Sequence, residues 1–284
     1  MKNQKTDMTE QLDQGKILPL VFRLSIPAVV AQLITFLYNI VDRMFVSQIK
    51  GSGMDALAAL GIVLPITLII QAFANLVGLG GSPRAGIKLG EDNREEANRI
   101  FNTAVTLLLI IGVTISVITF AFAEPIIRAF GCPESAVNYA VSYLKIYSGG
   151  TIFVMIPQGL NPFILTQGYS MFAMVSILVG AIINIILDPI FIFVLDMGVS
   201  GSSLATVLSQ LCSCICIIAF FYTKKSIFRF RFVDMRLKLS RVLDIASLGL
   251  TPFVMTITEC AIQIVFNVNL NWSTGGDKDY TAAL

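Results

Sequence analysis

The sequence predicts an all-α polytopic membrane protein, and three observations support this prediction. Hydrophobic residues make up 55% of the 284 residues and charged residues only 13%, whereas soluble domains carry about 25% charged residues. Polar side chains recur at helical spacing inside the apolar stretches, which places them on one face of each expected helix. Seven apolar stretches are long enough to cross a bilayer, and they cover roughly residues 20–47, 57–80, 100–123, 136–166, 171–195, 201–223 and 245–271.

The first span, 20–47, carries a polar stripe that ends in a carboxylate. Gln32, Thr35, Asn39 and Asp42 follow helical spacing. Pro27 lies in the same span, where it removes a backbone hydrogen bond and favours a bend, although membrane helices also tolerate proline without a functional reason. No apolar run before this span is followed by a small-residue cleavage site, so we expect an uncleaved anchor.

The second and fourth spans add polar and glycine-rich features. Gln71 and Asn75 lie one turn apart in the second span, and Gly78, Gly80 and Gly81 follow them. The glycines lack the lysine of a phosphate-binding loop, so we interpret them as a turn with close helix packing. The fourth span, 136–166, is too long for one straight crossing, and we expect it to tilt or to continue beyond the bilayer.

The fifth span contains the most informative residue, Asp188. A carboxylate at the centre of a membrane helix costs about 2.5–3.5 kcal/mol on insertion scales, so such residues are usually functional. Asn184, Gly180 and Ser176 precede Asp188 at four-residue spacing and share its face. Pro189 directly follows it and frees the carbonyl of Ile185. By contrast, single Asn, Gln and Thr residues are more often interhelical hydrogen-bond partners.

The sixth and seventh spans, and the absence of histidine, limit the possible chemistry. The chain has no histidine, which excludes histidine proton relays and His-bearing zinc sites. In the sixth span, Cys212, Cys214 and Cys216 are better explained as small packing residues than as a soft-metal site. In the last span, a further polar face is formed by Thr256, Glu259, Gln263 and Asn267.

The distribution of basic residues predicts the orientation. Basic residues cluster before the first span, after the second and after the sixth, and the positive-inside rule places these regions in the cytoplasm. We therefore expect a cell-membrane protein with a cytosolic N-terminal segment, 1–19, and a basic cytosolic connector, 224–244. The connector alternates Phe228 and Phe230 with arginines, which fits either a link lying on anionic headgroups or a plain cytosolic loop. A net charge of +2 gives no reason to expect nucleic-acid binding.

The sequence offers no nucleotide-driven energy source. It contains no GxxxxGK[ST] run and no soluble segment large enough for a nucleotide-binding domain. Any transport would therefore be driven by an ion gradient. Counting 1.5 Å per residue along the first and fifth helices places Asp42 and Asp188 at matching depths in the outer half of the membrane. We predict that they bind H⁺ or Na⁺, with no cofactor and no other metal.

Several segments resemble the multidrug and toxic compound extrusion (MATE) transporters. The strongest is NIILDPIFIF at 184–193, supported by LYNIVDRMFV at 37–46 and GLTPFVMTITECAIQIVFN at 249–267. The resemblance covers residues 15 to 272 and implies two six-helix lobes, twelve helices in all. It assigns 20–223 to a six-helix N-lobe and 245–284 to the seventh helix and tail, at the start of the second lobe. We therefore expect the chain to be a fragment of a longer transporter.

The resemblance also implies a function and site residues. It implies a secondary active antiporter, not an enzyme, that exports amphipathic and often cationic drugs and acts as a monomer among membrane lipids when full length. Asp42, Asp188 and Asn184 match the cation-coupling residues, Pro27 matches a helix-bending proline, and Glu259 matches an acid of the second lobe. The residues that we expect to line the cavity are Gln32, Thr35, Tyr38, Asn39, Gln71, Asn75, Tyr139, Tyr143 and Asn161.

Two other functions remain as alternatives. A lipid-linked saccharide flippase of the same wider superfamily would need a large basic cavity, yet only Arg43 and Lys145 lie near membrane depth. A non-transporting membrane scaffold gives no reason for two acids at matched depth. The neutral turn 167–170 departs from the charged turn of many family members, and we assign it no role.

Overall fold

The chain folds as a bundle of helices. The computed structural model describes residues 17–49, 51–235 and 237–273, which contain helices and no strand. The predicted N-terminal segment and the end of the predicted tail fall largely on residues 1–16 and 274–284, outside the described part. The elements are α2 (Ile17–Ser47), α3 (Gly53–Gly90), α4 (Arg94–Ala121), α5 (Ala123–Ala129), α6 (Val137–Gly149), α7 (Thr151–Thr166), α8 (Ser170–Pro189), the π-helix η1 (Ile190–Val194), α9 (Val199–Tyr222), the 3₁₀ turn η2 (Phe232–Met235) and α10 (Leu239–Ser273).

Six helices of the described part are long and apolar enough to cross a membrane. They correspond to six of the seven predicted spans. The remaining one, 136–166, which we expected to tilt or to continue beyond the bilayer, consists of two consecutive helices, α6 and α7, joined at Gly150. A Cβ on Gly150 would overlap the side chain of Val207 in α9. Helix α9 therefore packs directly against the backbone at the break.

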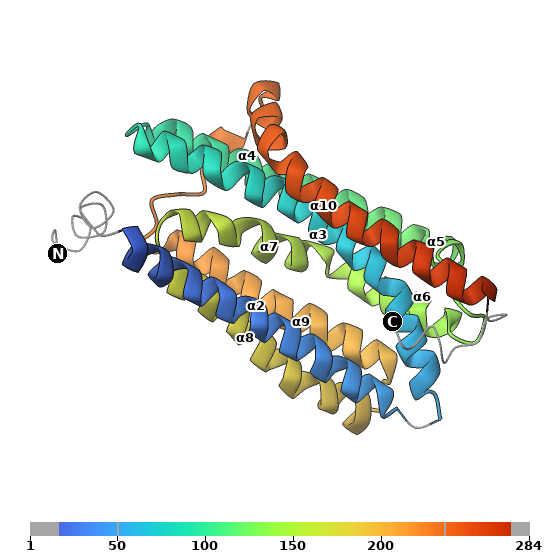
Figure 1. Cartoon of the computed structure of the whole chain (residues 1–284). Helices are drawn as coiled ribbons and strands as arrows, with labels where there is room; N and C mark the ends of the chain where they lie inside the picture. The colour runs from blue at the N-terminus through green and yellow to red at the C-terminus, as the bar shows by residue number, and fades with distance from the viewer. Residues whose placement is uncertain (1–16, 50, 236, 274–284) are drawn as a thin grey trace.

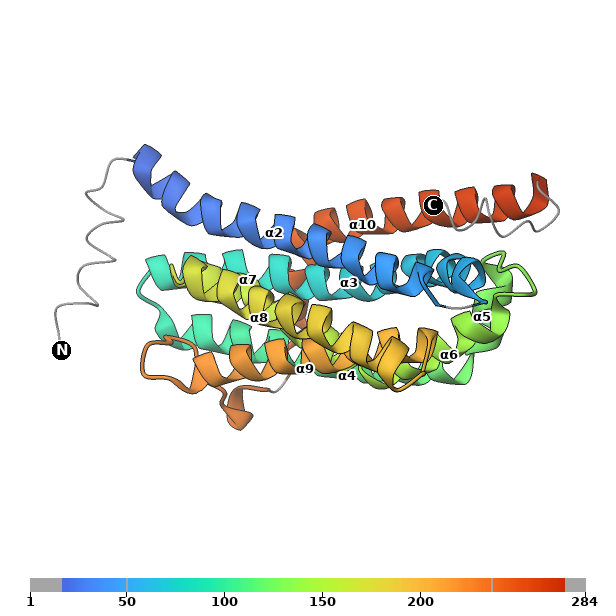
Figure 2. The same cartoon turned by 90° about the horizontal axis from the view of Figure 1, so that it is seen from below.

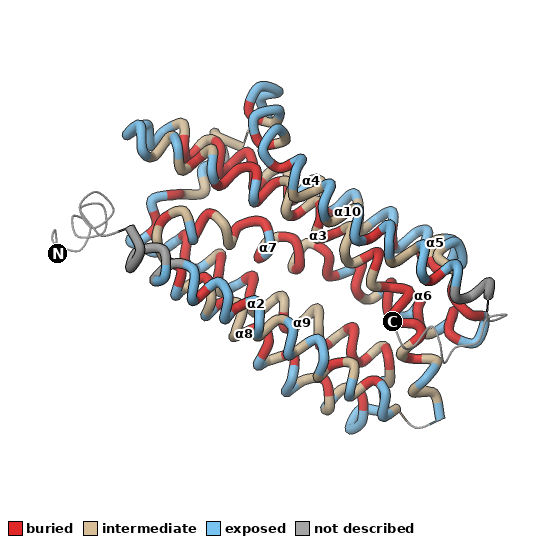
Figure 3. The backbone as a smooth tube through the Cα atoms, viewed as in Figure 1, coloured by how far each residue is buried: buried red, intermediate tan, exposed pale blue. Residues whose placement is uncertain are grey.

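Helix α7 lies at the centre of the bundle (Figure 1). It packs against α3 and α4 on one side and against α8 and α9 on the other, and much of its length is buried (Figure 3). Helix α2 packs mainly on α8, and α10 packs mainly on α3. We refer to helices α2 to α9 as the lobe.

The glycines of α3 allow two neighbouring helices to approach its backbone. A Cβ on Gly78 would lie 2.6 Å from the carbonyl oxygen of Gly159 in α7, and one on Gly80 would overlap that of Ile245 in α10. Close packing is therefore observed at these glycines. The predicted turn is wrong, because α3 continues as a helix through them to Gly90.

Helices α2 and α10 lie on one face of the bundle and are its least buried long helices (Figure 2). Only 11% of the apolar window of α2 and 17% of that of α10 are buried, against 56% for α3. Figure 2 shows α2 moving away from the bundle toward its N-terminal end. The helix remains continuous through Pro27, and its described buried residues, Pro27, Ala31, Asp42 and Val46, are spread along its length.

The connector between α9 and α10 is exposed along much of its length but inserts one aromatic side chain into the bundle. Phe228 is fully buried and stacks on Phe101 of α4, with ring centroids 5.2 Å apart. The interpretation that the connector lies on lipid headgroups is therefore wrong for Phe228, because this side chain packs in an aromatic cluster inside the bundle. Gln167, in the turn that was given no role, accepts a hydrogen bond from the backbone of Ile227 at 2.7 Å.

The orientation can be tested by cysteine labelling. Val233 in the connector is 81% exposed and Met54 at the start of α3 is 42% exposed. In a background without the five native cysteines, an impermeant thiol reagent applied to intact cells should label Met54→Cys and spare Val233→Cys. The reverse pattern would contradict the predicted cytosolic connector.

Candidate functional site

Two buried acids from different helices meet inside the lobe. Asp42 of α2 is 9% exposed and Asp188 of α8 is fully buried. Their carboxyl groups are close enough to interact electrostatically with each other, and Ser202 of α9 donates its hydroxyl to Oδ1 of Asp42 at 2.8 Å. Ionised carboxylates only accept hydrogen bonds. A direct hydrogen bond between these two would therefore require a proton on one of them, and two ionised carboxylates at this site would need a cation between them.

Asn184 and Asp188 each have one buried oxygen without a hydrogen-bond partner. Its Nδ2 donates to Oδ1 of Asp188 at 3.3 Å, while its own Oδ1 and Oδ2 of Asp188 are buried without a hydrogen-bond partner. Leaving a buried acceptor unpaired costs about 1–3 kcal/mol. Two such oxygens on neighbouring residues of one face indicate a place where a donor or a cation binds.

The backbone beside Asp188 is irregular. Pro189 has no N–H to donate, and α8 ends there and continues as the π-helix η1. Single π-helical turns are uncommon and occur frequently at functional sites. The sequence predicted the freed carbonyl of Ile185 but not the π-helical turn that follows it.

Two tyrosines surround the acids. The phenols of Tyr38 and Tyr143 are close enough to interact electrostatically with both Asp42 and Asp188. Tyr143 stacks on Tyr147, with ring centroids 6.1 Å apart. The acid pair therefore sits in a small network of polar groups contributed by α2, α6, α8 and α9.

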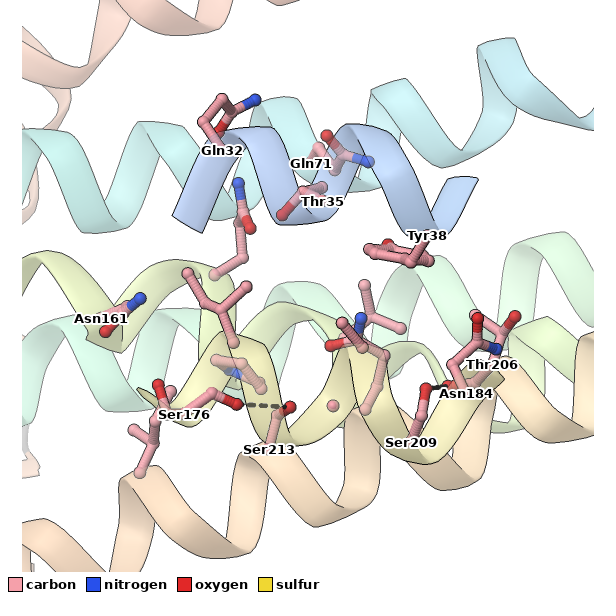
Figure 4. A pocket seen from close by; sticks show the side chains of 18 of the residues that line it. Gln32, Thr35, Tyr38, Gln71, Asn161, Ser176, Asn184, Thr206, Ser209 and Ser213 are labelled. Atoms are coloured by element: carbon pink, nitrogen blue, oxygen red, sulfur yellow. Dashed lines mark hydrogen bonds between the residues drawn. The ribbon is translucent and has the colours of Figure 1, made fainter. Parts of the chain in front are cut away.

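A cavity of about 180 Å³ opens beside this network, between α2 and the helices below it (Figure 4). Among the described residues that line it, none is charged. It includes six of the predicted site residues: Gln32, Thr35, Tyr38, Gln71, Asn161 and Asn184. Further polar side chains in its wall are Tyr147, Gln158, Ser176, Thr206, Ser209, Gln210 and Ser213.

Four residues expected to line the cavity lie outside its wall. Asn39 is exposed on α2 and donates back to the carbonyl of Thr35 at 2.9 Å. Asn75 accepts a hydrogen bond from Gln158 at 3.3 Å, so it contacts a lining residue without lining the cavity itself. Tyr139 packs against the hydrophobic core, and Tyr143 lies beside the acids. Helical spacing places residues on one face of a helix, but the tertiary packing decides which part of that face points into the cavity.

Glu259 lies apart from this network. It is exposed on α10, which packs mainly on α3. The lobe therefore brings together Asp42, Asp188 and Asn184, but not Glu259.

Comparison with known families agrees with this geometry. A family model described as MatE matches residues 27–190, more than half of the chain, including both acids. The chain belongs to the MatE family. The predicted resemblance is confirmed by this match.

Other members of the MatE family are similar along nearly all of this chain. The multidrug export protein MepA of Staphylococcus haemolyticus is 27% identical over 266 residues, which are 94% of this chain and 58% of that protein. MepA of Staphylococcus saprophyticus is 24% identical with the same coverage. This MatE chain therefore spans about 58% of the length of the relatives it matches.

Solved structures of MatE-family transporters share the fold. The MATE multidrug transporter DinF-BH, solved in complex with a ligand, superposes with a TM-score of 0.87 and 32% identity, over 95% of this chain and 60% of that one. A multidrug resistance MATE family transporter of the MOP superfamily in its inward-facing conformation gives a TM-score of 0.81 and 27% identity, over 93% of this chain and 59% of that one. The all-α polytopic membrane fold predicted from the sequence is confirmed.

Proposed function

We propose that this chain forms part of a cation-coupled multidrug exporter. Relatives that match 94% of it are named multidrug export proteins, and the chain carries a buried acid pair next to a polar cavity. The proximity of the buried Asp42 and Asp188, with Asn184 donating to Asp188, is the observation that carries the proposal. Two acids in contact inside a membrane protein need a proton or a cation, and a gradient of that ion is an energy source.

Asn184 gives the cavity a direct connection to the ion site. It lines the cavity and donates to Asp188, so an occupant that bonds to its free Oδ1 changes the environment of the acid pair through one residue. Binding of the ion between α2 and α8 would likewise alter how α2 packs over the cavity. Coupling arises when each ligand favours a different packing of α2.

The cavity wall favours an amphipathic organic cation as substrate. The rings of Tyr38 and Tyr147 offer π-faces that attract cations, and the amide side chains supply neutral hydrogen-bonding groups. The acid pair supplies negative charge nearby when its ion leaves. At about 180 Å³ the cavity is smaller than the 300–1,000 Å³ typical of drug sites, so we expect α2 to move outward when substrate enters.

Dye accumulation tests the proposal. Cells that express the protein in its full-length form should accumulate less ethidium than vector controls, and collapsing the proton and sodium gradients should abolish the difference. Replacing Na⁺ by choline at fixed pH then distinguishes the two ions. Export that survives gradient collapse but stops on ATP depletion would contradict a gradient-driven exporter.

A further inference from the structure

The connector between α9 and α10 is held by three side-chain amides of the lobe. The backbone N–H of Ile227 donates to Gln167 at 2.7 Å, that of Arg229 to Asn98 at 2.6 Å, and that of Arg231 to Asn102 at 2.9 Å. Each acceptor is the side-chain oxygen of an amide residue. The lobe therefore binds every second N–H between residues 227 and 231.

The spacing of the two asparagines matches an extended chain. Asn98 and Asn102 are four residues apart on α4, a rise of about 6 Å along a helix. Arg229 and Arg231 are two residues apart, which spans about 6.6 Å in an extended segment. Asn102 completes the match, because its Nδ2 donates to the carbonyl of Arg229 at 2.9 Å. The pairing uses only backbone groups of the connector.

The aromatic side chains between these amides enter the lobe. Phe228 stacks on Phe101 and meets Phe163 edge to face, with centroids 5.7 Å apart. Phe230 contacts Phe101 and Phe221, with centroids 5.3 and 5.8 Å away. Arg229, which lies between them, and Arg231, which follows Phe230, are less buried than Phe228. The side chains of Phe228 and Phe230 thus anchor the connector in the lobe. The backbone N–H groups of residues 227, 229 and 231 fix its register.

Ion pairs extend this hold to the start of α10. Arg241 in the first turn of α10 forms a two-pronged pair with Glu96 of α4, at 2.7 and 3.2 Å, and the Arg241 side chain is only 10% exposed. Arg99, which also pairs with Glu96, reaches Asp234 of η2 at 3.6 Å. Two-pronged arginine–carboxylate pairs have defined geometry and are among the stronger ion pairs.

We propose that residues 226–231 form a strap that is a fixed part of the lobe, and that the Glu96–Arg241 pair carries this hold to α10. Any reorientation of α10 over α3 then begins beyond Arg241 and not within the connector. This conformational device goes beyond the proposed function and does not depend on it, so its test uses no transport readout.

Hydrogen–deuterium exchange of the purified full chain in detergent tests the strap. In the wild-type chain the amides of Ile227, Arg229 and Arg231 should exchange far more slowly than an unstructured peptide. Asn102→Ala should accelerate exchange in 226–231 about fivefold, the effect of losing roughly one net hydrogen bond, and leave peptides of α8 unchanged. Unprotected wild-type amides, or equal acceleration in α8, would overturn the proposal.

Aspartate variants separate backbone recognition from simple loss of packing. Nδ2 of Asn98 has no hydrogen-bond partner, whereas Nδ2 of Asn102 donates to the carbonyls of Asn98 and Arg229. Both side chains are buried, so Asn→Asp introduces a buried charge at either position. Asn102→Asp should therefore accelerate exchange in the strap more than Asn98→Asp does. Equal effects would show that the amide donors do not hold the connector.

The ion pair is tested separately. Arg241→Ala should speed exchange in the first turns of α10, residues 242–250, and leave 226–231 protected. Acceleration of both segments together would show that the strap and α10 open as one unit, which contradicts the proposed hinge beyond Arg241.

Discussion

Replacing either Asp42 or Asp188 by asparagine should reduce gradient-driven dye export by the full-length protein to the level of the vector control. Asparagine has the size of aspartate but cannot take up a proton or supply a carboxylate to Na⁺. The hydrogen bond from Ser202 to position 42 can still form, and a neutral side chain lowers the cost of membrane insertion. Each variant should therefore reach the membrane in normal amounts and fail in ion coupling.

Asp196 provides a matched control for this prediction. It is exposed between η1 and α9 and has a positive φ of 51°, a backbone conformation that asparagine adopts readily. Asp196→Asn makes the same chemical change outside the acid pair and should export dye at the wild-type rate. Wild-type export by both Asp42→Asn and Asp188→Asn would show that the pair is structural.

The second large effect is expected at the crossing of α3 and α10. A Cβ on Gly249 would overlap the carbonyl oxygen of Leu76, a backbone atom that cannot move without shifting α3. Gly249→Ala must therefore push the two helices apart. Overpacking of this kind typically costs about 1–3 kcal/mol, occasionally more. We expect a clear fall in the thermal unfolding midpoint of the detergent-solubilised chain.

Gly90 at the end of α3 is the control for this substitution. A Cβ there meets no other atom within 4 Å, so Gly90→Ala should leave the unfolding midpoint unchanged or raise it slightly, because alanine favours helix over glycine by about 1 kcal/mol. If Gly249→Ala melts at the same temperature as Gly90→Ala, the close helix crossing does not contribute to stability.

Much of the fold could be predicted from the sequence because the signals are local. Apolar length and composition marked each crossing, since every membrane helix must satisfy its own backbone hydrogen bonds in lipid. The two acids were predicted from another local signal. A carboxylate is costly at membrane depth, and counting along two helices brought Asp42 and Asp188 to one level before their contact was seen.

Other features depend on which distant segments pack together, and local patterns do not carry that information. Thr35 and Asn39 belong to one polar stripe, yet the packing of α2 places Thr35 in the cavity wall and leaves Asn39 outside it. The break at Gly150 arises where α9 meets its backbone.

The sequence alone therefore determined the membrane helices and predicted that the two acids lie at one depth, through hydropathy and the cost of burying charge. Only the tertiary structure decided which polar groups meet. Asn98, Asn102 and Gln167 are ordinary polar residues in the sequence, and they hold the connector because folding places them opposite backbone groups at least 60 residues away.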